Sequence, residues 1–257
     1  MPFLLGELES DAQRRRHWAV GGFPDGGVLR PSRFPKWQND YMDLLVQRDL
    51  PNLGLSASPP LVSRLIRMLA SINGQTWNAS SLGRSLGIDS KTVTRYVDYL
   101  EGAFLVRRLE PLHANLKKRL VKSPKVYWRD TGVLHSLLQL HSPADLLSQP
   151  WVGASFENYA IEQILGHLSA HGVDARPSFL RTSDGHEIDL VLDLPGTRWA
   201  IEFKLTSNPS PQDLRKLESH ADWIDADKRA LISRTSEVVE SRSTVSCGLA
   251  QAIERIG

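Results

Sequence analysis

Alternating apolar and polar positions mark two short segments near the end of the chain, joined by a Pro-Gly turn. Apolar side chains occupy every second position in residues 187–194 and again in residues 199–205. This period of two predicts a pair of strands, each with one buried side. The polar positions include Asp189, Glu202 and Lys204. Charges on such strands usually face water. A functional interpretation must therefore explain more than simple solvation of these side chains.

The surrounding pattern predicts a domain of mixed helices and strands at residues 149–257. A long helix, three strands, a second helix and a further strand succeed one another, which is typical of a small mixed sheet flanked by helices. A last helix is expected near residues 245–256. The predicted elements, in order, are a helix at 152–172, strands at 178–181, 187–194 and 199–205, a helix at 211–222 and a strand at 229–233.

Helical spacing dominates the preceding region, residues 59–148. A first helix is followed by a short second helix, for which Asn78 is the expected N-cap and Gly87 the exit. The third helix is expected to begin at Asp89 or Ser90 and to lead into a β-hairpin. This order predicts a winged helix-turn-helix domain. Farther along, Asp130 stands where a strand gives way to a helix, and an N-cap is its simplest interpretation.

Residues 1–58 read as helix and loop with too few apolar residues for a core of their own. We expect them to pack against the segment that begins at residue 59, and they could also serve self-association or a separate protein partner. The overall fold class is therefore α+β, with a helical amino-terminal segment, a winged helix-turn-helix and a mixed α/β domain.

Composition narrows the functional classes only in part. Cys247 is the only cysteine among 257 residues, which excludes an internal disulfide and a thiolate metal cage. The formal net charge of +2 argues neither for nor against a nucleic-acid partner. No apolar run approaches the roughly 18 residues of a membrane span, and no signal peptide is apparent. A cytoplasmic location without a membrane partner is expected.

The winged helix predicts a DNA contact through its third helix and its wing. Protein-contact or linker roles stay open, since Asp98 and Glu101 on the third helix would repel phosphate. The candidate DNA-binding residues are Ser90, Lys91, Thr94 and Arg95 on the helix, and Arg107, Arg108, Lys117, Lys118, Arg119 and Lys122 on the wing.

The charged face of the hairpin suits a metal-dependent hydrolase. Carboxylates on adjacent strands are the hard oxygen ligands that Mg²⁺ prefers, with Mn²⁺ as an alternative. A nearby cation can polarise a water or stabilise charge on a phosphate. Asp189 and Glu202 are the expected metal ligands and Lys204 the expected catalytic cation. Glu157 on the long helix could add a third carboxylate, with Glu162 as its rival.

These residues resemble a known pattern. Asp189, twelve residues, then Glu202-Phe203-Lys204 is similar to the core motif of the PD-(D/E)XK nucleases, which implies a restriction-endonuclease-like fold and Mg²⁺-dependent cleavage of DNA. The stretches WAVGGFPDG, QRDLPNLG, PKVYWRDTGVLHSLL, GASFENYAIEQI, EIDLVLD and AIEFKLT resemble the carboxy-terminal half of uncharacterised prokaryotic AAA+ ATPases.

The chain departs from that family in one respect. It has no Gly-Lys-Ser/Thr phosphate loop, so the sequence predicts no ATP site and no ATPase activity of its own. It is expected to be a truncated or a naturally shortened form, in which residues 1–58 are what is left of the ATPase junction.

Three interpretations remain open from the sequence. The chain is a metal-dependent deoxyribonuclease, or it is an inactive module that binds nucleic acid or protein and regulates, or Asp189 and Lys204 form an ion pair on a solvated sheet. A surface ion pair contributes only about 0 to 1 kcal/mol, which leaves the third interpretation with little to explain the arrangement.

Overall fold

The chain folds into two compact units. The computed structural model describes residues 2–114 and 119–257. Unit 1 comprises Met1–Arg108 and Lys125–Asn158, and unit 2 comprises Leu109–Pro124 and Tyr159–Gly257. This division differs from the three expected segments, because residues 109–124 of the expected wing belong to unit 2. The fold class is the expected one, since a helical first part precedes a mixed sheet flanked by helices.

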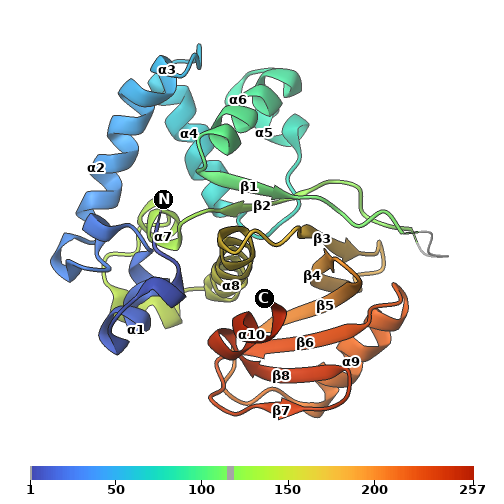
Figure 1. Cartoon of the computed structure of the whole chain (residues 1–257). Coiled ribbons are helices and arrows are strands. Elements are labelled where there is room, and N and C mark those ends of the chain that lie inside the picture. Colours follow the sequence, from blue (N-terminus) through green and yellow to red (C-terminus); the bar gives the residue numbers. More distant parts are fainter. Residues whose placement is uncertain (1, 115–118) are drawn as a thin grey trace. The chain divides into compact units, whose positions relative to one another are not determined.

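Unit 1 is built mainly from helices (Figure 1). Short 3₁₀ turns lie at Leu5–Glu7, Pro24–Gly26, Pro31–Arg33 and Pro143–Ser148, and a π-helical turn lies at Leu45–Asp49. Its helices and strands are α1 (Asp11–Val20), α2 (Lys36–Leu44), α3 (Leu50–Asn52), α4 (Pro59–Ser71), α5 (Ala79–Leu86), α6 (Ser90–Gly102), β1 (Val106–Leu109), β2 (Lys125–Trp128), α7 (Thr131–Leu137) and the first turns of α8 (Val152–Ala170).

The helix-turn-helix begins and ends where the capping residues predict. The Asn78 side chain accepts a hydrogen bond from the Ser81 amide at 3.0 Å, which caps α5. Gly87 ends α5 with a φ of 73°, a left-handed conformation that glycine adopts without strain. Asp89 then caps α6 by accepting from the Thr92 amide. Among the described residues β1 and β2 pair as a two-stranded sheet, which completes the winged arrangement.

The amino-terminal helices share one core with the helix-turn-helix. Leu50, which precedes the winged helix in the chain, is completely buried together with Leu65 of α4 and Leu100 of α6. Burial of a side chain of this size is worth about 2 kcal/mol relative to exposure. The expectation that residues 1–58 pack against the segment after them is therefore confirmed.

Asp130 holds two separate parts of unit 1 together. Its carboxylate accepts the Val133 amide at 2.8 Å, which caps α7, and the Gly22 amide at 2.7 Å. A side chain on Gly21, whose φ is 78°, would run into this carboxylate. The glycine pair in the sequence is thus explained by the close approach of its backbone to Asp130. The expected N-cap role of Asp130 is confirmed.

His135 is completely buried in α7 and is neutral by its contacts. Its Nδ1 lies 2.7 Å from the Ala19 carbonyl oxygen, so Nδ1 carries the proton and donates. Its Nε2 lies 2.6 Å from the Ser155 hydroxyl and accepts from it. Burial lowers the pKa of His135 from 6.5 to about 4, although the bond to Ala19 raises it.

We expect acid to destabilise unit 1 through His135. The folded pKa lies below the unfolded one, so stability is fully present above about pH 6.5 and is lost as the pH falls towards 4, by about 3 kcal/mol in all. Asp130 acts in the opposite direction, because burial raises its pKa to about 6. Urea unfolding of the wild type and of His135→Gln at about pH 7 and pH 4.5 isolates the histidine. Equal losses on acidification in both proteins would contradict this origin.

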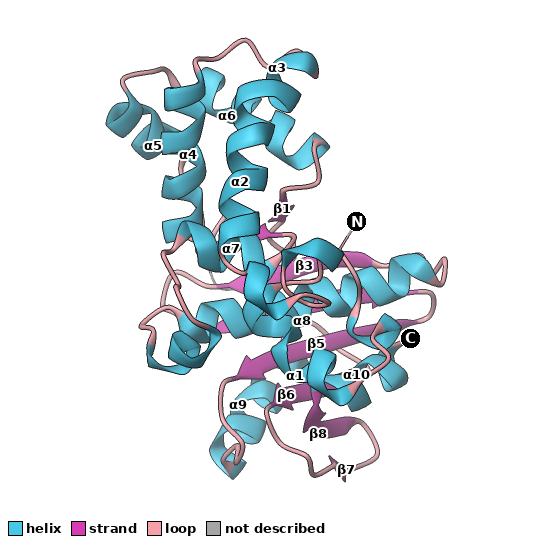
Figure 2. Cartoon of the chain, turned by 90° about the vertical axis from the view of Figure 1, so that its left-hand side faces the viewer, coloured by secondary structure: helices cyan, strands magenta, loops and turns pink. Residues whose placement is uncertain are grey.

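Unit 2 holds a mixed sheet. The described strands form a six-stranded sheet in the order β3-β4-β5-β6-β8-β7. Strands β3, β4 and β5 are antiparallel to their neighbours, β5, β6 and β8 run parallel, and β7 is antiparallel to β8. Figure 2 shows the strands in magenta. The elements are β3 (Arg176–Arg181), β4 (Glu187–Leu194), β5 (Thr197–Lys204), α9 (Pro211–Asp222), β6 (Lys228–Ser233), β7 (Val239–Glu240), β8 (Thr244–Gly248) and α10 (Leu249–Ile256).

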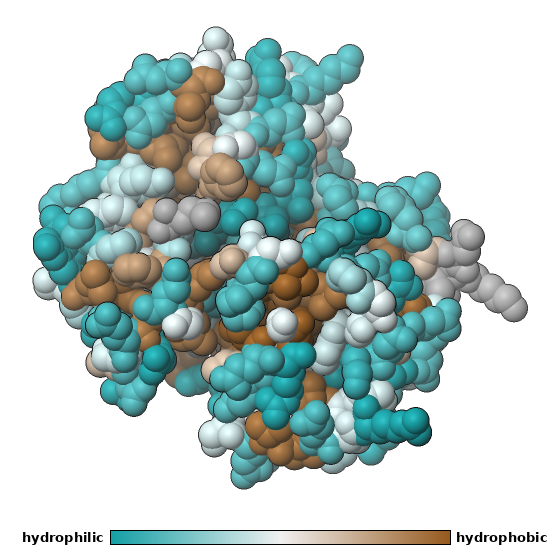
Figure 3. Space-filling view, viewed as in Figure 1, coloured by the Kyte–Doolittle hydropathy of each residue, from teal (hydrophilic) through white to brown (hydrophobic). Residues whose placement is uncertain are grey.

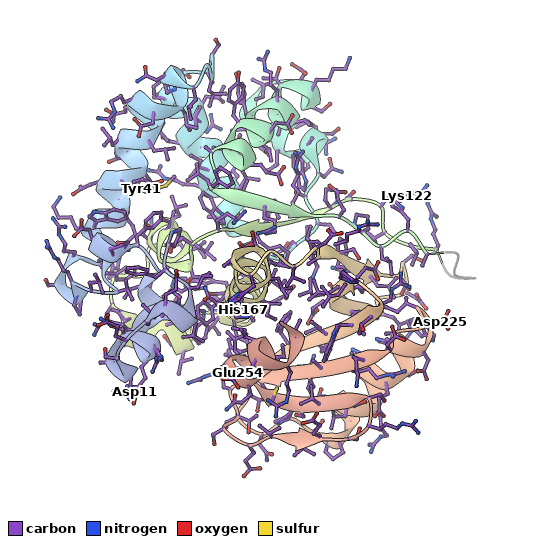
Figure 4. The ribbon with its side chains drawn as sticks, viewed as in Figure 1. Asp11, Tyr41, Lys122, His167, Asp225 and Glu254 are labelled. Carbon is purple, nitrogen blue, oxygen red and sulfur yellow. The ribbon has the colours of Figure 1, made fainter. Side chains whose placement is uncertain are left out.

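Helices cover both faces of this sheet. Leu217 and Ala221 of α9 pack in one buried cluster with Val191, Ala200 and Leu231 of the central strands. The end of α10 lies on the opposite face beside the end of α8 (Figure 1), and Figure 4 labels Glu254 and His167 on these two helices. The hairpin is therefore central to unit 2, with α9 on the face that Val191 and Ala200 share.

One predicted element is wrong in its first part. Residues 245–248 were expected to begin the last helix, but they belong to β8, and the helix begins at Leu249. Val245 pairs with Ala230 of β6 in parallel register and is buried. An apolar run of this length fits a buried strand as well as a helix, so pairing with β6 decides it.

The segment between β1 and β2 forms an arm that lies along β3. We call residues 110–114 and 119–122 the arm. The Leu112 amide donates to the Phe179 carbonyl at 2.7 Å, and the Val121 amide donates to the Arg181 carbonyl at 2.8 Å. Leu112 and Leu120 pack against the cluster beneath α9. The arm thereby covers the outer edge of β3, which would otherwise present unpaired backbone groups.

The surface drawn in Figure 3 is largely hydrophilic, with hydrophobic side chains in separate patches. Phe104, Leu53 and Val239 are the most exposed large apolar side chains of the described residues, each more than half exposed. Single exposed side chains of this kind need no partner to explain them. In the described part of the chain, no helix combines the length and the apolar character needed to cross a membrane.

Candidate functional site

The hairpin of β4 and β5 brings the predicted carboxylates and lysine together. Its antiparallel register pairs Leu190 with Ile201. The regular pairs of β4 and β5 end there, and Asp189 lies just beyond the last pair. Its carboxylate binds the backbone amide of Phe203, the residue between Glu202 and Lys204. Glu202 and Lys204 are two positions apart on β5 and so share one face of the sheet. The three residues lie where β5 ends, at one end of the sheet.

A backbone amide holds the Asp189 carboxylate in place. Its Oδ2 accepts a hydrogen bond from the Phe203 amide at 2.9 Å, across from β4 to β5. Asp189 is half-buried, and Phe203 is buried. A carboxylate bound to a backbone N–H has a fixed position, so Asp189 is presented at the sheet end in a defined orientation.

Lys204 forms an ion pair with Glu202. The Lys204 Nζ lies 2.8 Å from Oε1 of Glu202, and the Glu202 side chain is only 12% exposed. Burial lowers the pKa of Lys204, but the charges of Glu202 and Asp189 outweigh it and raise the pKa above its ordinary value. Lys204 therefore carries a positive charge at neutral pH. It can donate hydrogen bonds and stabilise negative charge, and it cannot act as a base there.

The first turn of α9 adds a third carboxylate near the lysine. Asp213 and Ser210 form a reciprocal capping box, in which the Ser210 amide donates to Asp213 at 2.9 Å. Hydrogen bonds from Ser210 lower the pKa of Asp213, and the charge of Lys204 lowers it further, although burial raises it. The charge around Lys204 is therefore negative overall, as a cation-binding position requires.

Glu157, the expected third ligand, has other contacts within unit 1. Its Oε1 lies 2.9 Å from Nζ of Lys125, a lysine that is only 2% exposed, and it also accepts from the Tyr127 hydroxyl. A buried ammonium needs a counterion, and these contacts are those of a counterion. Its rival Glu162 is buried in the unit 2 part of α8.

The expected DNA-binding residues are sorted by their contacts. Arg108 is committed to acids of α6, with its guanidinium 2.8 Å from Asp98 and in contact with Glu101. Lys91 and Arg95 are exposed on α6, whereas the Thr94 hydroxyl donates to the Ser90 carbonyl.

The remaining candidates lie in or next to the arm. Arg107 is half-buried in β1, and Arg119 and Lys122 are exposed on the arm. Lys117 and Lys118 lie outside the described residues. The wing that the sequence predicted is thus divided between β1 in unit 1 and the arm in unit 2.

Two histidines near the site were not anticipated as a pair. His220 of α9 donates from Nδ1 to the Glu187 carbonyl at 3.0 Å, which leaves its Nε2 to accept from Nδ1 of His186 at 3.1 Å. Nε2 of His186 then faces the Asp184 carboxylate at 3.5 Å. The two histidines are 34 residues apart in sequence, so no local pattern could have paired them.

The donor set suits a hard divalent cation. Mg²⁺ is commonly held by one or two carboxylates and keeps several waters. Asp189 and Glu202, both at the end of β5, are carboxylates of this kind, and their chemistry therefore fits Mg²⁺ or Mn²⁺. Among the residues that the structure describes, no group of three or more His, Cys, Asp or Glu side chains is arranged to hold a metal ion. A cation bound by Asp189 and Glu202 would therefore have two protein ligands and would take its other ligands from water.

Comparison with known proteins gives a family and no activity. The chain is similar to the "Uncharacterized protein Mb2031c" of Mycobacterium bovis and the "Uncharacterized protein Rv2008c" of Mycobacterium tuberculosis. Each is 36% identical over 196 residues, which cover 76% of this chain and 44% of the relative. The chain thus spans less than half the length of these relatives. No solved structure matches it.

Two family matches divide the chain much as its two units do. Residues 152–250 match the family described as "Domain of unknown function (DUF4143)". Most of these residues belong to unit 2. Residues 11–144 match "Domain of unknown function (DUF8612)" and lie mostly in unit 1. Because the second of these matches covers more than half of the chain, the chain belongs to the DUF8612 family.

Proposed function

We propose that the chain is a divalent-metal-dependent nuclease that hydrolyses phosphodiester bonds in DNA at Asp189, Glu202 and Lys204. The observation that carries this proposal is the clustering of the three side chains at the end of β5: the Asp189 carboxylate is held by the Phe203 amide at 2.9 Å, and Lys204 lies 2.8 Å from Glu202. A buried acid and a half-buried lysine on the same face cost desolvation free energy that apolar residues would avoid. A catalytic role accounts for that cost.

Each residue has a defined part in the proposed reaction. A water oxygen bonds to phosphorus and releases a proton to solvent, the bridging phosphorus–oxygen bond breaks, and the departing oxygen takes up a proton from solvent. Asp189 and Glu202 would hold the metal, which would supply charge neutralisation at the phosphate and a more acidic water. Lys204 donates a hydrogen bond to the phosphate or to the attacking water and stabilises the growing negative charge.

The resemblance to AAA+ proteins with a nuclease-like end supports the same proposal. The sequence has no Gly-Lys-Ser/Thr loop, so ATP binding is not assigned to these residues. We propose that an ATPase, where one is needed, acts together with this chain. DNA positioning is assigned to the exposed cations Lys91 and Arg95 of α6.

A second function is favoured by one observation. Lys204 and Glu202 already satisfy each other, and a closed ion pair of this kind is also what an inactive domain would retain. The alternative is a module that binds nucleic acid or protein and regulates without turnover. It predicts that the chain binds DNA without cleaving it.

We expect cleavage to need a divalent cation. The purified chain should cut plasmid or single-stranded DNA with Mg²⁺ or Mn²⁺, and EDTA should stop the reaction, because the acidic side chains outnumber Lys204 and would repel a phosphate unless a divalent cation were bound. Gel analysis of the products measures this. Cleavage that persists in EDTA would overturn the site assignment. Binding without cleavage under any metal would favour the regulatory module.

A further inference from the structure

The arm forms one wall of a hollow in unit 2. The hollow has a volume of about 840 Å³, and its lining includes Arg119, Leu120, Lys122 and His113 of the arm together with Ser183 of the β3–β4 turn. The Ser183 amide donates to the Arg119 carbonyl at 2.9 Å, which fixes the arm against the turn. Figure 4 labels Lys122 on this arm. Backbone hydrogen bonds therefore hold the arm, which forms this wall, against both β3 and the β3–β4 turn.

The cations of the hollow differ from the other candidate cations in their contacts. Arg108 and Lys125 are each bound to a carboxylate, at 2.8 and 2.9 Å. Arg119 and Lys122 are exposed, and within the described part of the chain no carboxylate lies within ion-pair distance of either. The lining of the hollow contains no acid. The lining residues that carry a full charge are thus both cations.

The hollow and the candidate site lie at the same end of the sheet. Arg181, the last residue of β3, pairs with Glu187, the first residue of β4. Glu187 precedes Asp189 by two positions, and Lys204 is the last residue of the neighbouring strand β5. Since Ser183 lies in the turn just beyond Arg181, the cationic hollow continues from the sheet end that carries the carboxylates.

We propose that the hollow beneath the arm binds the phosphodiester backbone of a nucleic-acid strand and guides it to the carboxylate site. The guanidinium of Arg119 and the ammonium of Lys122 match phosphate oxygens, and the Ser183 hydroxyl adds a neutral donor. Leu112 and Leu120 give the hollow an apolar part that suits sugars and bases. The inference rests on the proposed function for the identity of the ligand, and it adds a strand-binding surface on the arm of unit 2 to the cations assigned on α6.

The dependence of binding on salt tests this assignment. Fluorescence anisotropy with labelled single- and double-stranded oligonucleotides in EDTA measures binding while cleavage is blocked. Each phosphate contact that is lost lowers the slope of log K against log salt by about 1. The double variant Arg119→Gln/Lys122→Gln of the full chain should therefore bind more weakly, with a slope reduced by about 2. Both side chains are exposed, so the thermal unfolding of the variant should match the wild type.

Lys228→Gln provides the matched control. Lys228 is exposed at the start of β6, at the opposite end of the sheet, and its replacement should leave the slope unchanged. An unchanged slope in the double variant, or an equal change in Lys228→Gln, overturns the proposal. Full competition by millimolar inorganic phosphate would show a site for free phosphate instead. Arm-dependent binding without any cleavage in metal would retain this inference and overturn the proposed nuclease.

Discussion

A Lys204→Met variant should cleave DNA at least about 100-fold more slowly than the wild type in Mg²⁺. Removing one preorganised donor to a developing negative charge typically lowers kcat by about 10²- to 10³-fold. Methionine keeps much of the length and packing of the lysine stem but carries no charge. Initial rates at saturating DNA, measured on a plasmid substrate, give the comparison. The same substitution at Lys228, far from the site, is the control and should leave the rate unchanged.

Asp189→Asn separates charge from structure at the same site. The asparagine oxygen can still accept the Phe203 amide, so the hairpin should fold while the metal loses a charged ligand. Cleavage should fall strongly, and higher Mn²⁺ should restore part of it. Asp193→Asn is the matched control, since Asp193 lies on the same strand in an ion pair with Arg198. Undiminished cleavage in both Lys204→Met and Asp189→Asn would eliminate the proposed site.

A Glu157→Ala variant should destabilise unit 1 by about 3 kcal/mol or more. Loss of the Glu157 carboxylate breaks its 2.9 Å contact with a buried ammonium, and breaking a buried ion pair typically costs about 3–5 kcal/mol. Lys125 is 2% exposed, so water cannot replace the carboxylate. Urea unfolding measures the loss. The double variant Lys125→Met/Glu157→Leu should recover most of it, because it removes both charges together.

The same position distinguishes a counterion from a metal ligand. Glu157→Gln retains hydrogen bonding and should stay folded at low temperature. If Glu157 acts only as a counterion, this variant should retain metal-dependent cleavage when assayed well below its unfolding temperature. A large loss of cleavage with unchanged stability would instead make Glu157 the third ligand that the sequence suggested.

Local patterns predicted the elements whose cause is local. The period of two indicated the hairpin, because each face meets a different environment. It did not show the irregularity of β4 between Ile188 and Val191, which pack in one cluster although the alternation sets them on opposite faces. Asn78, Asp89 and Asp130 were recognisable as caps, since a cap satisfies backbone groups only two or three residues away. For the same reason Gly87 marked a helix end.

The features that the sequence did not predict depend on contacts between residues far apart in the chain. Val245 reads equally well in a helix, and only its register with β6 makes it a strand. The arm looked like a wing because its partner strand begins more than fifty residues later. His220 gave no signal, since its contact with His186 depends on how α9 packs against the β3–β4 turn. Arg108 looked free for DNA until Asp98 was seen beside it.

The arm also limits where the chain can be cut into fragments or joined to another gene. The chain passes from unit 1 to unit 2 at residue 109, returns at residue 125 and crosses again at residue 159. A gene fusion or an expression fragment that starts near Pro150 would carry the sheet without the arm, and would leave the β3 edge open to pairing with other chains. Evolution can therefore exchange the amino-terminal helices of unit 1 only if the arm is kept. Each unit is compact by itself, but the path of the chain joins the two as one genetic module.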